Sequence, residues 1–125
     1  MAEQEWYEKA RSVIETANVL TLATDDGGKP WAVTVLCTIE SGQLVWDSLP
    51  DARHSKYVAA NPNVAFNIHD GQENAVYGRA VVESTEPLDT GQTRYSSGIS
   101  ELWVVTNQKE DGQFIPAEEL DPKEL

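Results

Sequence analysis

The sequence predicts a mainly β protein of the α+β class, with six antiparallel strands closing into a barrel. One helix is expected before the strands and a short one between the third and fourth strands. Outside these two stretches, apolar and polar residues alternate with the period of two that is typical of strands. The links between strands are short and rich in Gly, Pro, Asp and Asn, which favours antiparallel neighbours. Barrel closure removes the edges that six short strands would otherwise expose.

The first element is a helix over Glu5–Ala17, where apolar residues recur at helical spacing and the intervening residues are mostly charged or polar. Asn18 can end this helix because Asn tolerates the left-handed conformation. The positions expected to be buried are Trp6, Ala10, Val13, Ile14 and Ala17.

The next two elements are strands, Val19–Thr24 and Trp31–Ile39, joined by residues 25–30 in a hairpin. Val33, Val35 and Cys37 share one face of the second strand. We therefore expect Cys37 to be a small buried hydrophobe.

A third strand over Leu44–Ser48 stops at Pro50, and Asp51 is expected to cap a short helix over Ala52–Ala60. Asn61 and Pro62 then end this helix.

A second hairpin pairs the strand that contains Val64, Phe66 and Ile68 with Ala75–Glu83, through a turn at Asp70-Gly71. Residues 87–100, rich in Gly, Ser and Thr, are interpreted as a loop with a turn of helix near Gln92–Tyr95. Glu101–Thr106 is the sixth strand. The acidic residues 110–125 are expected to be an irregular or partly mobile tail.

Size and charge limit the possible functions. A chain of 125 residues is one domain, residues 1–125. Nine Lys and Arg against 21 Asp and Glu give a net charge of −12, so nucleic acid and membrane surfaces are not expected as partners. A local basic cluster can still bind one phosphate, since distant charges are screened. With one cysteine, no signal-peptide pattern and no apolar run of about 20 residues, we expect a cytoplasmic protein.

The run Leu44–Pro62 is the most informative stretch: an apolar strand ends in a polar turn, a basic pair opens a helix, and Asn-Pro precedes the next strand. Together with Gly28-Lys29-Pro30 and Gly78, this pattern resembles the FMN-binding split-barrel proteins related to pyridoxamine 5'-phosphate oxidase. The resemblance covers roughly Ala10–Glu83.

The resemblance implies a split barrel, a homodimer, and FMN held between the two subunits, with an FMN-dependent oxidoreductase activity as the implied function. Arg53 and His54 would hold the phosphate, and Ser48 would offer a hydroxyl. Arg is a multi-donor fork suited to phosphate, and a helix start adds free N–H groups. The backbone of the second strand would meet the flavin ring at Val33, Thr34 and Val35.

One departure narrows the implied activity. The parent oxidase carries an Arg and a Lys on the second strand, but Trp31–Thr38 contains no basic residue. A genuine pyridoxamine phosphate oxidase is therefore not predicted. Shorter relatives use FMN, the deazaflavin F420 or haem, or have no established reaction. A deazaflavin- or haem-binding relative, and a ligand-binding dimer without catalysis, remain alternatives.

The other candidate residues have simpler interpretations. His69 is a turn histidine with no second His or Cys at metal-ligand spacing, so no metal site is predicted. Trp31, Trp46 and Trp103 are interpreted as packing or interface residues. Arg79 would form a surface salt bridge or lie at a subunit interface. No catalytic side chain is predicted, because a bound flavin would supply the redox chemistry.

Overall fold

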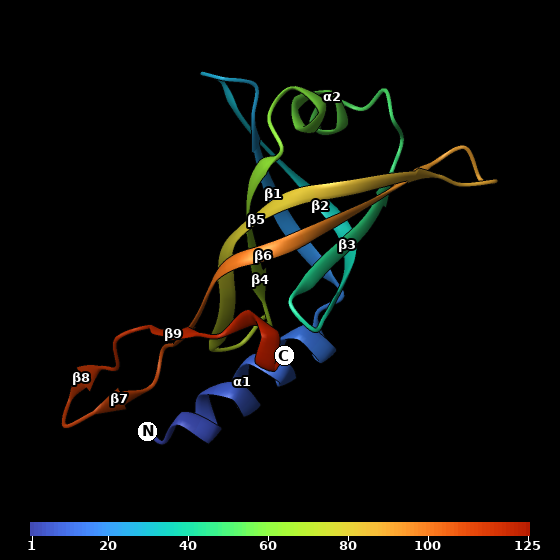
Figure 1. Ribbon diagram of the computed structural model, residues 1–125. Coiled ribbons are helices and arrows are strands. Elements are labelled where there is room, and N and C mark those ends of the chain that lie inside the picture. The colour runs from blue at the N-terminus through green and yellow to red at the C-terminus, as the bar shows by residue number, and fades with distance from the viewer.

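The structure is a computed structural model that describes all 125 residues. Two α-helices, nine strands and a terminal 3-10 helix follow one another along the chain (Figure 1). In order they are α1 (Glu3–Thr16), β1 (Val19–Asp25), β2 (Pro30–Glu40), β3 (Gln43–Ser48), α2 (Arg53–Ala60), β4 (Asn63–His69), β5 (Asn74–Pro87), β6 (Thr93–Thr106), β7 (Lys109–Glu110), β8 (Gln113–Phe114), β9 (Glu118–Leu120) and η1 (Pro122–Glu124).

The predicted six-stranded antiparallel barrel is confirmed. The strands follow the order β3-β2-β1-β4-β5-β6, and pairing of β3 with β6 closes the ring. Leu22 on β1 lies between Val33 on β2 and Phe66 on β4, and Trp46 on β3 faces Tyr95 on β6. These inward positions come from the alternation seen in the sequence.

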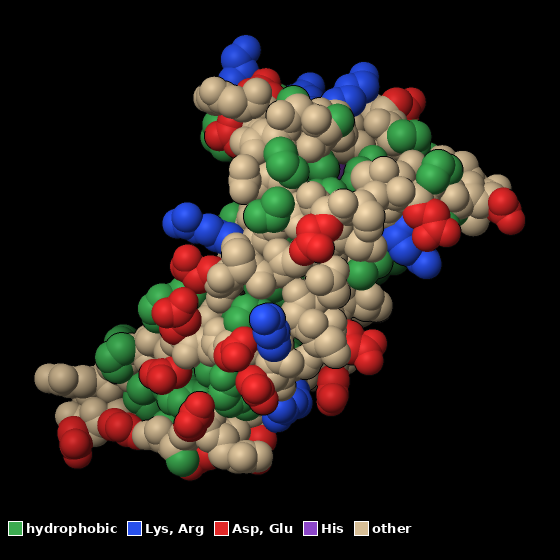
Figure 2. All heavy atoms as spheres, in the orientation of Figure 1, with side chains coloured by type: hydrophobic (Ala, Val, Ile, Leu, Met, Phe, Trp, Pro, Cys, Tyr) green, Lys and Arg blue, Asp and Glu red, His purple; other side chains and the backbone are tan.

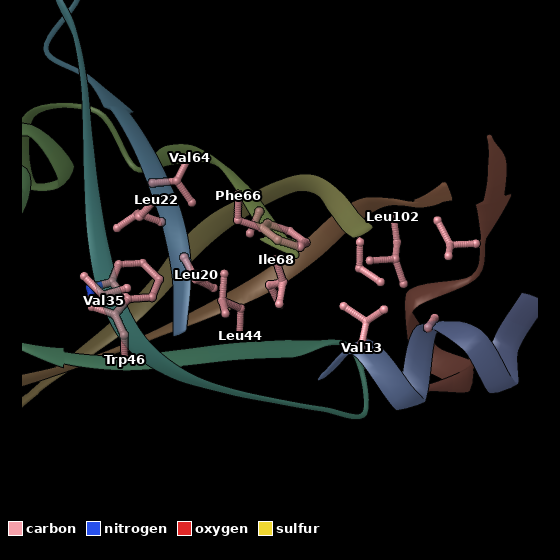
Figure 3. Packing of buried hydrophobic residues seen from close by; sticks show 14 of the residues in the cluster. Val13, Leu20, Leu22, Val35, Leu44, Trp46, Val64, Phe66, Ile68 and Leu102 are labelled. Carbon is pink, nitrogen blue, oxygen red and sulfur yellow. The ribbon is translucent and has the colours of Figure 1, made fainter. Parts of the chain in front are cut away.

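The barrel interior holds the main hydrophobic core. Leu20, Leu22, Leu44 and Ile68 converge there, and Val35 lies beside Trp46 toward the other end (Figure 3). Cys37 is half-buried against this core, as the alternation along β2 predicts, and burial raises the pKa of its thiol to about 11. The predicted helix is also confirmed: α1 buries Trp6, Ala10 and Val13. Neither α-helix is long and apolar enough to cross a membrane.

The acidic C-terminal segment is not irregular, which corrects the sequence-based expectation. It adds β9 to β6 as a seventh strand, and Leu120 is only 4% exposed. The Asp121 amide donates to the Tyr7 hydroxyl at 2.9 Å, and the Leu125 carbonyl accepts from the Ser41 amide. The tail therefore fastens α1 to the barrel.

Residues 87–100 are not a loop either. β5 and β6 pair as far as Pro87 and Thr93, with register shifts after Arg79 and after Val82, so most of the segment is strand and residues 88–92 form the turn. The prediction failed because Gly91 and Gly98 were interpreted as loop signals, whereas tertiary contacts decide the structure here. Tyr95 stacks on Trp46 with ring centroids 5.6 Å apart, and the fully buried Ser97 hydroxyl donates to the Leu44 carbonyl at 2.8 Å.

Helix α2 lies across one end of the barrel, against β1 and β2 (Figure 1). The expected Asp51 cap is wrong: Ala52 occupies the N-cap position, and no side chain caps the helix. The start of the helix is held instead by the buried Ser55 hydroxyl, which donates to the Leu49 carbonyl at 2.7 Å. The amides of the first turn are consequently left without a capping partner.

Candidate flavin site

The barrel opens between β2 and β3. Their pairing covers only Cys37–Glu40 with Gln43–Trp46, and beyond it the strands separate toward α2 (Figure 1). Successive residues of a strand point their amides to opposite sides. Cys37 donates to Asn18 on the β1 side, so the N–H groups of Thr34 and Leu36 face the opening. Part of β2 is thus an unpaired strand edge, although the pairing of β3 with β6 completes the ring of strands.

The three ring-contact candidates differ in what they offer. Val33 and Val35 point their side chains into the core and their amides toward β1. Thr34 is exposed, and its backbone faces the opening. Leu36, which the sequence reasoning did not select, is 66% exposed and shares the orientation of Thr34. The sequence could have indicated Leu36, because alternation places Leu36 on the same face of β2 as Thr34.

A hollow of about 450 Å3 lies where the β2–β3 pairing ends. Leu36 and Thr38 line it from β2, and Asp47 and Arg94 line it from β3 and β6. Arg94 binds Asp47 through two hydrogen bonds, Nε to Oδ1 at 2.9 Å and Nη2 to Oδ2 at 3.1 Å. This pairing with Asp47 raises the pKa of Arg94 above its ordinary value. The sequence reasoning missed Arg94 because it placed the residue in a loop.

Ser48 and His54, both selected from the sequence, meet at the end of the barrel. His54 Nε2 lies 2.8 Å from Ser48 Oγ, and the two residues are 8% and 6% exposed. Burial lowers the pKa of His54 below its ordinary value of 6.5. His54 is therefore neutral near pH 7 and joins the first turn of α2 to the end of β3.

Arg53 points outward at the start of α2. Its guanidinium carbon lies 4.1 Å from the centroid of the Trp31 ring, within the range of a cation–π contact. The sequence reasoning had interpreted Trp31 as a packing residue and gave no hint of this contact. The N–H groups of Arg53, His54 and Ser55 begin the helix without side-chain caps, so a cation and a helix N-terminus coincide here.

The charge of the protein is unevenly distributed. Lys and Arg side chains appear at the α2 end, whereas acidic side chains crowd the end formed by α1 and the C-terminal segment (Figure 2). The ion pairs of the structure are Arg94 with Asp47 and the N-terminus with Glu110. Arg53 is therefore not neutralised by a carboxylate, despite the net charge of −12.

The sequence profile of the pyridoxamine 5'-phosphate oxidase family matches residues 7–120. The chain belongs to this family. No curated protein has a significantly matching sequence.

Several solved structures share the fold at low sequence identity. An F420 reductase superposes with a TM-score of 0.68 at 16% identity, covering 74% of this chain and 94% of its own. An FAD-binding protein from Mesorhizobium loti gives 0.65 at 15% identity, covering 78% and 90%. A haem-binding protein from Mycobacterium smegmatis gives 0.71 at 19% identity, covering 93% of this chain and 57% of its own. Proteins with different names and ligands therefore share this fold.

Proposed function

We propose that the protein binds FMN where β2 separates from β3, as a homodimeric flavoprotein with oxidoreductase activity. The observation that carries the proposal is the free backbone edge at Thr34 and Leu36, close to the unneutralised Arg53 at the start of α2. Both features match FMN: its planar ring has polar edges that a strand edge can bind, and its phosphate is an anion that Arg53 can bind. The bound flavin would supply the electron transfer.

The phosphate would be held by the Arg53 guanidinium and the first-turn amides of α2. These groups match the donors that anions find at helix N-termini. Trp31 would orient Arg53 by stacking. His54 is then a positioning residue, because its side chain is buried against Ser48 while its backbone N–H belongs to the first turn.

The ring would lie along β2. The N–H groups of Thr34 and Leu36 are available to its polar edge, and the Leu36 side chain offers an apolar contact. Trp46 Nε1 is buried without a hydrogen-bond partner beneath this region of the barrel. These groups support the proposal that the flavin ring lies along β2.

A second copy of the chain would complete the groove. Between Asp25 and Glu40, which lie at strand ends, the outward positions of β1, β2 and β4 form a patch without an acidic or basic side chain, in a chain with 21 acids. They are Val19, Thr21, Ala23, Ala32, Thr34, Leu36, Thr38, Asn63, Ala65 and Asn67. An uncharged face that also contains the proposed ring contacts is suited to burial between subunits. Arg79, exposed beside Ala65 and in no ion pair, would lie at its margin.

The site supports binding of one phosphate only. Trp31–Thr38 has no cation, and Arg94 is already paired with Asp47. A substrate with its own phosphate would find no second anion site, so pyridoxamine phosphate oxidation is not proposed. Haem is less well supported than flavin, because His54 Nε2 is occupied by Ser48 inside the barrel. Deazaflavin shares the requirement for a long planar groove and remains the second candidate.

The proposal is tested by adding FMN, F420, haem or riboflavin to the purified protein and measuring absorption spectra and affinities. We expect FMN to bind most tightly. Arg53→Ala should weaken FMN roughly ten- to a hundredfold while changing riboflavin little, because only FMN carries the phosphate. Lys123→Ala, a charge change at the opposite end, is the control. Equal losses for both ligands would remove Arg53 from the phosphate site, and absence of flavin uptake would refute the function.

A further inference from the structure

A second hollow, of about 620 Å3, lies between α2 and the β5–β6 hairpin. It shares no lining residue with the hollow beside Arg94, and with the proposed flavin contacts it shares only Ser55, whose amide belongs to the first turn of α2. Hydrophobic side chains reach the surface between these elements (Figure 2). Its volume falls within the range of sites that hold small organic molecules.

Two polar groups in this hollow have no partner in the protein. Lys56 on α2 takes part in neither ion pair. Tyr95 is 6% exposed and its hydroxyl makes no hydrogen bond. The buried side-chain atoms without a partner are Trp46 Nε1 and Asn74 Oδ1, so the Tyr95 hydroxyl keeps some contact with solvent, and Tyr95 lines this hollow. Lys56 and Tyr95 thus line one hollow, and neither the ammonium nor the hydroxyl group has a partner in the protein.

The rest of the lining combines apolar side chains with polar ones, the latter being Ser55, Glu83, Ser84, Thr85 and Thr93. Three proline rings border the hollow, Pro50 and Pro62 beside the ends of α2 and Pro87 at the end of β5, and Val58 and Val82 add branched side chains. Tyr95 is itself fixed by stacking on Trp46. Such walls lose little conformational entropy when a flat molecule binds between them.

We propose that this hollow is a second binding site, independent of the flavin, for a small aromatic carboxylate. The ring would lie among the proline and valine side chains, and the carboxylate would accept hydrogen bonds from Lys56 Nζ and the Tyr95 hydroxyl. A single negative charge is favoured over a phosphate dianion, because Lys56 is the only cation in the lining and Glu83 lies in the same wall.

Benzoate is a suitable probe, and benzamide is its neutral match. Amide NMR spectra of the 15N-labelled full chain should show saturable shifts at Lys56, Ser84 and Thr93 on addition of benzoate, whether or not FMN is present. Benzamide should bind at least about tenfold more weakly, since it cannot form the charged contact. Shifts centred on Thr34 and Leu36 would place the ligand in the flavin groove and overturn the proposal, as would the absence of saturable shifts.

Two substitutions test the named contacts. Lys56→Gln and Tyr95→Phe should each weaken benzoate about three- to tenfold or more while leaving FMN affinity unchanged. Lys123→Gln is the matched control and should bind benzoate as the unchanged protein does. Equal benzoate affinity in Lys56→Gln would refute the site. FMN binding is measured in a separate titration, so a failure to bind FMN would not change how the benzoate result is interpreted.

Discussion

The Arg53 guanidinium stacks on the Trp31 ring at 4.1 Å, joining the start of α2 to the start of β2. Trp31 is 39% exposed, so the stack lies at the surface. Replacing Trp31 by Leu should weaken FMN about two- to fivefold, equivalent to roughly 0.5–1 kcal/mol, because Arg53 loses its orientation. The measurement is flavin fluorescence quenching. In Arg53→Ala the Trp31 substitution should have no further effect, and additive losses would contradict the coupling.

His54 should make stability depend on pH. Its pKa in the folded protein lies below the ordinary 6.5, so its contribution is complete above that value and is lost as pH falls through the folded pKa. The free energy of unfolding in urea should therefore fall as the pH is lowered from above 6.5 through the folded-state pKa of His54. His54→Gln removes this component, and the comparison of the two proteins separates it from the titrating carboxylates. Parallel pH profiles would show that His54 does not titrate as described.

Cys37 should be a slow nucleophile in the folded protein. Burial raises its pKa to about 11 from 9.0, so about a hundredfold less thiolate is present near pH 8 than in the unfolded chain. A chromogenic disulfide reagent should react correspondingly slowly in buffer and rapidly in urea. Equal rates in the two conditions would mean that the thiol is freely solvated.

Leu120 should contribute substantially to stability, although it lies in the acidic tail. It is 4% exposed and pairs with Leu102 across β6 and β9. Leu120→Ala should lower the free energy of unfolding by about 2–5 kcal/mol. The neighbouring exposed Glu119→Ala is the control, with an expected change within about 0.5 kcal/mol. A negligible loss for Leu120 would mean that β9 is not bound in solution.

The uncharged outer face should control assembly. Thr21→Glu introduces a carboxylate at its centre, and burying two such charges across a symmetric interface is strongly unfavourable. Size-exclusion chromatography with light scattering should show a dimer for the unchanged protein and a monomer for this variant. Ser12→Glu, on the exposed side of α1, should remain dimeric. A monomeric unchanged protein would remove the second wall of the proposed groove.

The sequence predicts the barrel well because apolar and polar residues alternate along its strands, and this pattern is local. Alternation places Leu20, Leu22 and Phe66 inside whatever their partners are. It fails at Ser97, whose buried hydroxyl is satisfied by a carbonyl from another strand. It fails again at Leu120, because a three-residue strand with two acids and one leucine has no local signal for docking. In both places contacts between residues distant in the chain decide the structure.

The site is predicted less completely than the fold. Ser48, Arg53 and His54 were predicted from the family resemblance, and the structure brings Ser48 and His54 into contact. The sequence did not predict their orientations, since only the folded chain shows that His54 turns inward while Arg53 turns outward. Leu36 and Arg94 depend on strand register and on barrel closure, which a single sequence does not contain.

The separation of β2 from β3 bears on the resistance of the protein to aggregation. A free strand edge can recruit a strand from another molecule and start aggregation. Here the unpaired length of β2 is short, because β3 pairs with it over Cys37–Glu40 and α2 lies across the end of the barrel, so little edge is left for an extended chain. Amide exchange should then alternate along β2, fast at Thr34 and Leu36 and slow at Val33 and Val35, because only the latter amides are bonded to β1.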